Sequence, residues 1–310
     1  MFLTVTANTS LDRIVFLEEF LPGKTMRTGN YLDSIGGKGL DIALVQRTFD
    51  LDTTALAFIA GYNGKLLSQL MDKAGIRSDL VWVEGDTRIS HIIVETAHRR
   101  HSHIITPGFE VSEEDCDQFI ARYEAYLPQA EWVIIAGTLP GGAPRDLYAR
   151  MTRLAQQAGK PVAVDCFGPP ANDAVRAGPT LMKMNRHEMS VTFGLPGENM
   201  DEIQHSAGAI RAKFDLDNFV VTCGEDGIIA VTRQGSWRAF GPRQVEVNGT
   251  GAGEAVSAML AWRLSLGETW PAALTWAAAA GAATVLTRGS GECRQIDVQR
   301  LLPEIQVLSI

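Results

Sequence analysis

Short apolar runs alternate with longer segments of helical periodicity along most of the chain. The helical spacing of apolar residues is clear in segments 112–127 and 146–159, which lie between such runs. Strands that are apolar throughout and separated by helices predict a mainly parallel sheet covered on both faces, a three-layer αβα sandwich of the α/β class. The candidate strands are residues 2–7, 54–60, 132–137, 161–166, 181–185, 219–224 and 228–232.

Two segments depart from this rhythm, at about residues 12–35 and 86–106. Both alternate apolar with polar residues, as half-exposed antiparallel strands do, and both are insertions between elements of the main sheet. We expect them to pair as a small β lid. No internal repeat or low-complexity linker divides the chain, so a single domain spanning residues 1–310 is predicted.

The net charge and the cysteine content limit the binding partners and the location that we expect for this protein. A net charge of −8 argues against nucleic-acid and membrane-surface partners, since both are anionic. A phosphate-bearing ligand must therefore meet a local basic pocket. The N-terminus lacks the features of a signal peptide, and the longest apolar stretch, residues 272–286, is interpreted as a buried helix. Four scattered cysteines suit reduced thiols, so a cytoplasmic protein is expected.

Two glycine-rich segments each lead into a helical pattern. Gly36, Gly37 and Gly39 surround Lys38, and a second segment occupies residues 248–256. Glycine lets the backbone approach a ligand closely, and the free N–H groups at a helix start attract anions. Neither segment has the Walker A spacing, and no G-x-G-x-x-G follows the first strand. From these residues alone, a tight turn with a helix cap remains an equal alternative.

Short motifs occur in a fixed order along the whole chain. They are TANTSLD at 6–12, GGKGLDIA at 36–43, TRIS at 87–90, AGTLPGG at 136–142, KMNRHE at 183–188, VTCGEDG at 221–227 and VNGTGAGEAVSA at 247–258. Together they resemble the motifs of the PfkB (ribokinase-like) carbohydrate kinase family. Their spacing is most similar to the 1-phosphofructokinase and tagatose-6-phosphate kinase group. The resemblance implies a ribokinase-like fold and transfer of the γ-phosphoryl group of ATP to a sugar hydroxyl.

The resemblance assigns the chemistry to the start of the last motif. The backbone amides of Gly251, Ala252 and Gly253 would hold the transferring phosphoryl group, and Glu254 would accept the hydroxyl proton. The family has aspartate where this chain has Glu254. The extra methylene moves the carboxylate by roughly 1 Å, and a misplacement of that size can cost about 10²-fold in rate. The alternative is a glutamate favoured only by the helix dipole.

On the nucleotide side, the resemblance implies that ATP and Mg²⁺ are the cofactors. Asn185 and Glu188 resemble the pair that orders Mg²⁺ and its waters near the phosphates. The expected nucleotide-binding residues are Lys183, Asn185, Thr222, Gly224 and Gly227.

On the acceptor side, Asp12 would hydrogen-bond the sugar hydroxyls. Lys38 and Arg88 are the candidates for a substrate phosphate, and arginine suits this role because its planar fork meets phosphate in two bonds. Lys24 and Arg27 are further candidates for binding this phosphate. The alternative interpretation is that they are solvated charges of the lid. Gly37 and Asp41 complete the predicted substrate site.

Several acceptor-side residues depart from the family pattern. Asp41 and Ser90 stand where the family has asparagine, His103 replaces a glutamate, and Ile105 replaces an asparagine. A carboxylate at Asp41 would repel a phosphate unless it pairs with Lys38 or Arg88. The run from His98 through Arg99 to His103 suggests a metal site, but a basic strand turn is the favoured interpretation because no nearby carboxylate or cysteine completes such a site.

The leading hypothesis is an ATP- and Mg²⁺-dependent kinase of a sugar phosphate. A second hypothesis is a catalytically weakened homologue that binds its ligands without turnover, supported by the joint departures at Asp41, Ser90, Ile105 and Glu254. A third is a kinase of an unphosphorylated sugar or nucleoside. The exposed edges of a small lid sheet also favour a homodimer formed through the lid.

Overall fold

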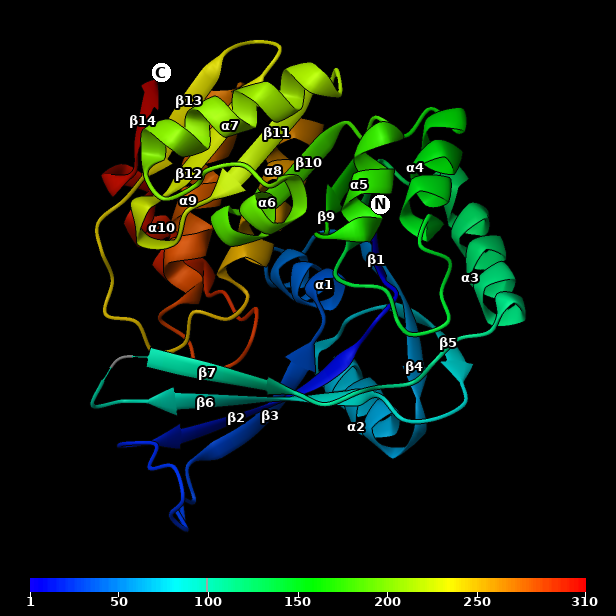
Figure 1. The fold of residues 1–310 in the computed structure, drawn as a ribbon, viewed down its shortest axis with the longest axis vertical. Helices are drawn as coiled ribbons and strands as arrows, with labels where there is room; N and C mark the ends of the chain where they lie inside the picture. Colours follow the sequence, from blue (N-terminus) through cyan, green and yellow to red (C-terminus); the bar gives the residue numbers. More distant parts are fainter. Residues whose placement is uncertain (99) are drawn as a thin grey trace.

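The computed structural model describes residues 1–98 and 100–310, and it places a ten-stranded sheet at the centre of the molecule (Figure 1). Strands β1, β4, β5 and β8–β11 run parallel, and β12–β14 extend the sheet in antiparallel fashion. The strands in spatial order are β14 (Gln306–Ser309), β13 (Ser236–Phe240), β12 (Ile228–Thr232), β11 (Asn218–Thr222), β10 (Leu181–Asn185), β9 (Val162–Asp165), β8 (Trp132–Ala136), β1 (Phe2–Thr6), β4 (Thr53–Ala60) and β5 (Ser78–Val83).

Helices cover both faces of this sheet, which confirms the predicted three-layer sandwich. One face carries α3 (Glu113–Tyr126), α4 (Leu147–Gln157), α5 (Pro169–Arg176), α6 (Arg186–Phe193) and α7 (Met200–Lys213). The other carries α1 (Lys38–Thr48), α2 (Gly61–Ala74), α8 (Ala252–Ser265), α9 (Trp270–Thr284) and α10 (Gln295–Leu301). Short 3-10 turns lie at Leu127–Gln129, Gly224–Asp226 and Leu302–Glu304.

All the predicted strands are present, and three others were not predicted: β5, β13 and β14. These three lie toward the sheet edges and carry exposed or half-exposed residues. Because these strands mix apolar and polar residues, they lack the continuous apolar run that identifies a strand buried on both faces. The stretch predicted as a buried helix is α9, and no helix in the described residues is both long and apolar enough to cross a membrane. All four cysteines are buried and free.

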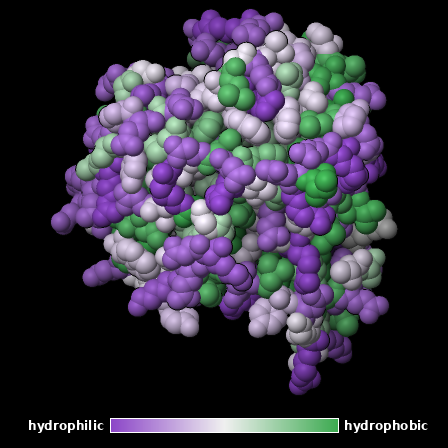
Figure 2. Space-filling model, turned by 180° about the vertical axis from the view of Figure 1, so that it is seen from behind, coloured by the Kyte–Doolittle hydropathy of each residue, from purple (hydrophilic) through white to green (hydrophobic). Residues whose placement is uncertain are grey.

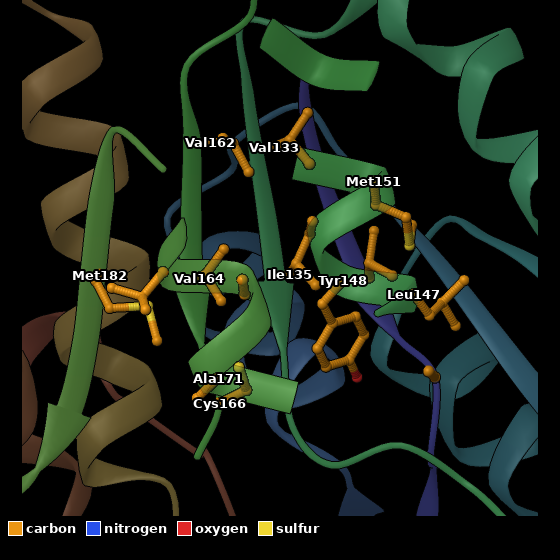
Figure 3. Close-up of a cluster of buried hydrophobic side chains, with 14 of the residues drawn as sticks. Val133, Ile135, Leu147, Tyr148, Met151, Val162, Val164, Cys166, Ala171 and Met182 are labelled. Carbon is orange, nitrogen blue, oxygen red and sulfur yellow. The ribbon is translucent and has the colours of Figure 1, made fainter. Parts of the chain in front are cut away.

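The core shows how strand alternation builds two helical layers. In β4, Leu56 and Phe58 face the α3–α7 layer, whereas Ala57 and Ile59 face the opposite layer. Figure 3 shows part of the first layer, where strands β8 and β9 pack against α4 and α5. Within it, the buried Tyr148 hydroxyl donates to the carbonyl of Thr138 at 3.0 Å. This bond fixes the loop that follows β8, at the end of the sheet where ligands bind in such folds.

The predicted lid segments form a second sheet of four strands, which we call the lid. Its strands are β3 (Tyr31–Gly36), β2 (Ser10–Leu17), β6 (Arg88–Glu95) and β7 (Arg100–Ile105), in that order. Each segment is an antiparallel pair, as expected, but the two segments join through a parallel pairing of β2 with β6. Arg99 lies outside the described residues. The lid projects from the body, and its tip is mainly hydrophilic (Figure 2).

Gly39 sets the distance between α1 and β1. A Cβ added there would lie 2.4 Å from Thr6 Oγ1 and 2.5 Å from the carbonyl oxygen of Val5. The obstruction is partly backbone, so the helix would have to move. Because α1 begins at Lys38 and carries Asp41, its seating decides where both side chains stand.

We therefore expect Gly39→Ala to destabilise the protein by roughly 1–3 kcal/mol, since an added methyl overpacks this contact. The matched control is Gly208→Ala within α7, where a Cβ meets nothing within 4 Å. That change should stabilise by about 0.5–1 kcal/mol through helix propensity. Urea unfolding of both variants measures the difference, and a Gly39→Ala protein as stable as the parent would contradict the packing argument.

Candidate active site

The carboxyl ends of β9, β10 and β11 bring polar residues together. Asp165, Asn185 and Thr222 are the last residues of these adjacent strands, and Asn185 is in register with Thr222. The first turns of α1 and α8 contribute side chains to the same edge, since Lys38 from α1 and Glu254 from α8 lie 3.8 Å apart. Residues far apart in the sequence thus share one site because parallel strands end at one edge of a sheet.

Asp165 is the centre of a buried ion network. Its Oδ1 accepts from Lys38 Nζ at 2.8 Å, and its Oδ2 accepts from Lys183 Nζ at 2.8 Å and from Ser257 Oγ at 2.9 Å. Burial alone would raise the pKa of Asp165, but the two ammonium groups outweigh it and lower this pKa to about 2. The carboxylate therefore stays ionised and holds both lysines.

Lys38 also joins the network to Glu188, whose Oε1 accepts from Nζ at 2.7 Å. Burial opposes the charged form of Lys38, yet the surrounding carboxylates of Asp165, Glu254 and Glu188 raise its pKa well above the usual range. A permanently charged ammonium group therefore stands beside the first turn of α8. It can neutralise an anion that binds there.

The start of α8 is built to approach an anion. Gly251 has a φ of 92°, and a Cβ on it would meet the backbone nitrogen of Gly291 at 2.2 Å. The amides of Gly253 and Glu254 donate to no acceptor within the described residues. Free amides at a helix start, together with the helix dipole, form an anion site. The Lys183 ammonium lies close by, 2.8 Å from where a Cβ of Gly253 would stand.

A cavity of about 470 Å³ extends from this helix start. Its polar end includes Lys38, Lys183, Asn185, Glu188 and Glu254. The lining that includes residues of α9 is mainly apolar, with Ile228, Phe240, Pro242, Val256, Ala278, Gly281, Ala282 and Val285, and the charged Glu225, Arg243 and Glu246 also line the cavity. An anion site joined to an apolar slot in a cavity of this size suits a nucleotide, with phosphates at one end and the base at the other.

Asn185 and Glu188 form a capping box at the start of α6. Asn185 Oδ1 accepts from the Glu188 amide at 2.8 Å, and Glu188 Oε2 accepts from the Asn185 amide at 2.9 Å. Carboxylate oxygens keep further lone pairs, so Glu188 can still face a hydrated cation. In the described parts of the chain no three His, Cys, Asp or Glu side chains are grouped to hold a metal directly. The residues present therefore fit a Mg²⁺ ion that keeps waters and phosphate oxygens as ligands.

The acceptor-side residues gather around Asp12. Asp12 accepts from the hydroxyls of Ser10 and Ser290, both at 2.8 Å, and burial raises the pKa of Asp12 to about 6. Arg88 donates to the carbonyl of Asn8 at 3.3 Å. Burial lowers the pKa of Arg88 and the nearby Asp12 carboxylate opposes that shift. Asp41 is buried against the loop that carries Gly291.

The remaining predicted residues divide into two groups. Gly224 and Gly227 line the cavity with Thr222, and Gly37 is the N-cap of α1. Lys24 and Arg27 are exposed in the loop between β2 and β3 and do not line the cavity. Their position favours the interpretation as solvated lid charges.

Side-chain contacts on two sides join the lid to the body. His101 of β7 lines the cavity and lies 3.3 Å from Glu246, measured from Nδ1 to Oε1. The Glu246 hydrogen bond raises the pKa of His101 and lowers that of Glu246. On the other side, the Ser290 amide donates to Ser34 Oγ at 3.1 Å. His101 therefore pairs with the carboxylate of Glu246. This pairing favours the interpretation of the histidine run as a basic strand turn over its interpretation as a metal site.

Sequence reasoning missed several residues of this site. Asp165 is the penultimate residue of the predicted strand 161–166, so its place near the carboxyl edge was a usable signal. Ser257 lies one helical turn after Gly253 and faces the same side. Ser290 and Glu246 gave no such signal, because loops bring them to the site. Ser34 gave none because it lies on lid strand β3 and meets Ser290 only where the lid packs against the body.

Comparisons with known proteins agree with this architecture. The sequence profile described as pfkB family carbohydrate kinase matches residues 2–297. D-tagatose-1-phosphate kinase of Bacillus licheniformis is 29% identical over 297 residues, covering 96% of each chain. 1-phosphofructokinase of Bacillus subtilis is 28% identical over 307 residues, covering 99% of each. The structure of a possible 1-phosphofructokinase from Thermotoga maritima superposes with a TM-score of 0.91 at 24% identity, covering 100% of this chain and 99% of the other.

We expect Asp165→Asn to destabilise the protein by roughly 3–5 kcal/mol, because it leaves the buried Lys183 ammonium group without its carboxylate and removes one of the two carboxylates bonded to Lys38. The control is Asp50→Asn, since Asp50 is exposed at the end of α1.

The pH dependence gives a second measure of the same pair. The pKa of Asp165 is depressed from its usual 3.8 to about 2, so its contribution is complete above about pH 3.8 and is lost as pH falls toward 2. Denaturant unfolding between pH 2 and 7 should show the free energies of unfolding of the parent protein and of Asp165→Asn converging at the acid end. Parallel curves across that range would count against the network.

Proposed function

As a member of the pfkB family of carbohydrate kinases, this chain is a sugar kinase, and we propose that it transfers the γ-phosphoryl group of ATP to a hydroxyl of a sugar phosphate. The observation that carries the proposal is the start of α8, where free amides, Lys38 and Glu254 meet at one end of the cavity. The curated relatives are named for phosphorylated fructose and tagatose, which supports this acceptor class.

In this proposal ATP occupies the cavity with its phosphates at the start of α8. The free amides of Gly253 and Glu254 receive the transferring phosphoryl group, and Lys38 and Lys183 offset its charge. Of the amides that the resemblance assigns to this role, that of Ala252 instead donates to the carbonyl of Gly249 at 3.3 Å. Thr222, Gly224 and Gly227 line the nucleotide site. Asn185 and Glu188 would hold Mg²⁺ through its waters, and that ion would neutralise phosphate charge.

Glu254 is the proposed base. It lies in the first turn of α8, is buried, and has its Oε1 3.8 Å from Lys38 Nζ. The acceptor hydroxyl gives its proton to Glu254 while its oxygen forms the new bond to phosphorus, and the bond to the ADP oxygen breaks. A glutamate reaches farther than the aspartate of the family, so the acceptor must sit farther from the helix than it does in relatives.

The acceptor itself would lie between the lid and the body. Asp12 offers hydrogen-bond acceptors to the sugar hydroxyls, and Arg88 offers donors to a phosphate. Both belong to lid strands that start beside the site. The lid contacts through Ser290 and His101 would then exclude water from the reacting groups.

We expect Glu254→Gln to lower turnover by about 10²–10⁴-fold, because the amide cannot take the proton. Nucleotide affinity should change little, since the free amides and lysines remain. Coupled ADP release measures turnover, and calorimetry measures nucleotide binding. Glu254→Asp, which restores the residue of the family, is the matched control and should keep part of the activity.

An acceptor screen of ketohexose 1-phosphates, ketohexose 6-phosphates and free sugars accompanies these variants. Full activity of Glu254→Gln would refute the base assignment. Binding of nucleotide and sugar phosphate without turnover on any acceptor would favour the weakened homologue. Turnover only with unphosphorylated acceptors would favour the third hypothesis.

We also propose that two copies associate through the lid. Every residue of β7 is exposed, and this strand forms a free edge of the lid. Ile104 and Tyr31 are 52% and 58% exposed. Ile104→Lys should shift the sedimentation coefficient from dimer to monomer, whereas Val191→Lys on α6 should leave it unchanged. A parent protein that sediments as a monomer at micromolar concentration would refute the proposal.

A further inference from the structure

Two buried carboxyl groups of the acceptor side have no cation at ion-pair distance within the described residues. Asp41 Oδ1 is fully buried and has no hydrogen-bond partner. Asp12 accepts only from the hydroxyls of Ser10 and Ser290. Buried carboxylates are ordinarily paired with a cation or bonded to several donors. Asp41 departs furthest from that rule.

Both groups contact the same loop, so they lie in one region of the acceptor side, which we call the compartment. Ser290 holds Asp12, and a Cβ on the next residue, Gly291, would lie 2.9 Å from Asp41 Oδ1. After burial, the carboxyl groups of Asp12 and Glu254 are the main causes that raise the pKa of Asp41 well above its usual range. The proposed base therefore stands within electrostatic reach of both aspartates.

Of the two nearby cations that the structure describes, Lys38 is already paired with other carboxylates, and Arg88 is the candidate for binding a phosphate. Lys38 bonds to Asp165 and Glu188, so its ammonium group is shared between those acids. Arg88 bonds only weakly, and its Nε has no partner in the described chain, which leaves donors for a phosphate. Among the described residues, the compartment thus contains one cation with free donors, Arg88, within electrostatic reach of Asp12, and the unpaired carboxyl group of Asp41.

A metal ion does not suit this pair of aspartates. No three acidic, His or Cys side chains among the described residues are close enough together to bind one. A primary ammonium group does suit it, because it carries a positive charge and three donors that can reach carboxylates several ångströms apart.

We propose that the acceptor is a phosphorylated amino sugar whose ammonium group binds between Asp41 and Asp12. Its phosphate binds at Arg88, and its reacting hydroxyl faces Glu254. This inference rests on the proposed function, because it assigns the substrate class of the same site. It also gives Asp41 a reason to replace the neutral asparagine that would suit an ordinary sugar phosphate.

The test compares three forms of each acceptor: hexosamine 1- and 6-phosphates, the matching hexose phosphates, and the N-acetylated hexosamine phosphates. ATP turnover is followed with the parent protein, with Asp41→Asn and with the control Asp72→Asn, whose side chain is exposed on α2. For the parent, kcat/KM for the amine should exceed that for the hydroxyl and N-acetyl forms by about 100-fold. Asp41→Asn should remove this preference by lowering the amine value, and Asp72→Asn should keep it.

Calorimetry of the parent protein with each acceptor compares their binding affinities without any substitution, and the amine forms should bind more tightly than the hydroxyl and N-acetyl forms. Equal use of amine and hydroxyl forms, or an unchanged preference in Asp41→Asn, would overturn the inference while leaving the kinase proposal standing. In that case Asp41 acts as a neutral carboxylic acid in place of asparagine. Failure of every phosphorylated acceptor to support turnover would overturn both proposals.

Discussion

The pairing of Asp165 with Lys38 and Lys183 is the interaction on which the rest of the site depends. It joins the end of β9 to the first residue of α1 and to β10, so elements from different parts of the chain share one buried carboxylate. Such a pair adds little to stability on its own, because desolvation offsets most of its Coulomb energy. Its effect is geometric, because it holds the charged Lys38 beside the start of α8. The backbone amides at that helix start have no partner in the described chain, so an anion can bind there.

The two sides of the site then follow different physical rules. On the nucleotide side, positive charge and free amides come from elements fixed by the core, and the cavity continues into an apolar slot. On the acceptor side, carboxyl groups dominate, and much of the site comes from the lid. Asp12 is held by Ser10 of the same strand and by Ser290 of the body. The contacts between the lid and the body would therefore complete the proposed acceptor site and exclude water from it.

Much of this architecture could be predicted from the sequence. The buried strands were visible because parallel strands covered on both faces are continuous apolar runs, and the lid segments were visible because they alternate. Strands at or next to the sheet edges, such as β14 and β13, show neither pattern. The glycine segments marked both helix starts. The partners of Asp165 and the isolation of Asp41 could not be predicted, since burial and ion pairing depend on which segments meet in three dimensions.

The central claim is that the start of α8 binds the transferring phosphoryl group beside Glu254. A crystal structure with a non-hydrolysable ATP analogue and Mg²⁺ tests it most directly. The terminal phosphate should lie within hydrogen-bond distance of the amides of Gly253 and Glu254, with the Glu254 carboxylate directed at the acceptor space. A nucleotide bound with its phosphates away from this helix, or a Glu254 side chain turned out of the site, would contradict it.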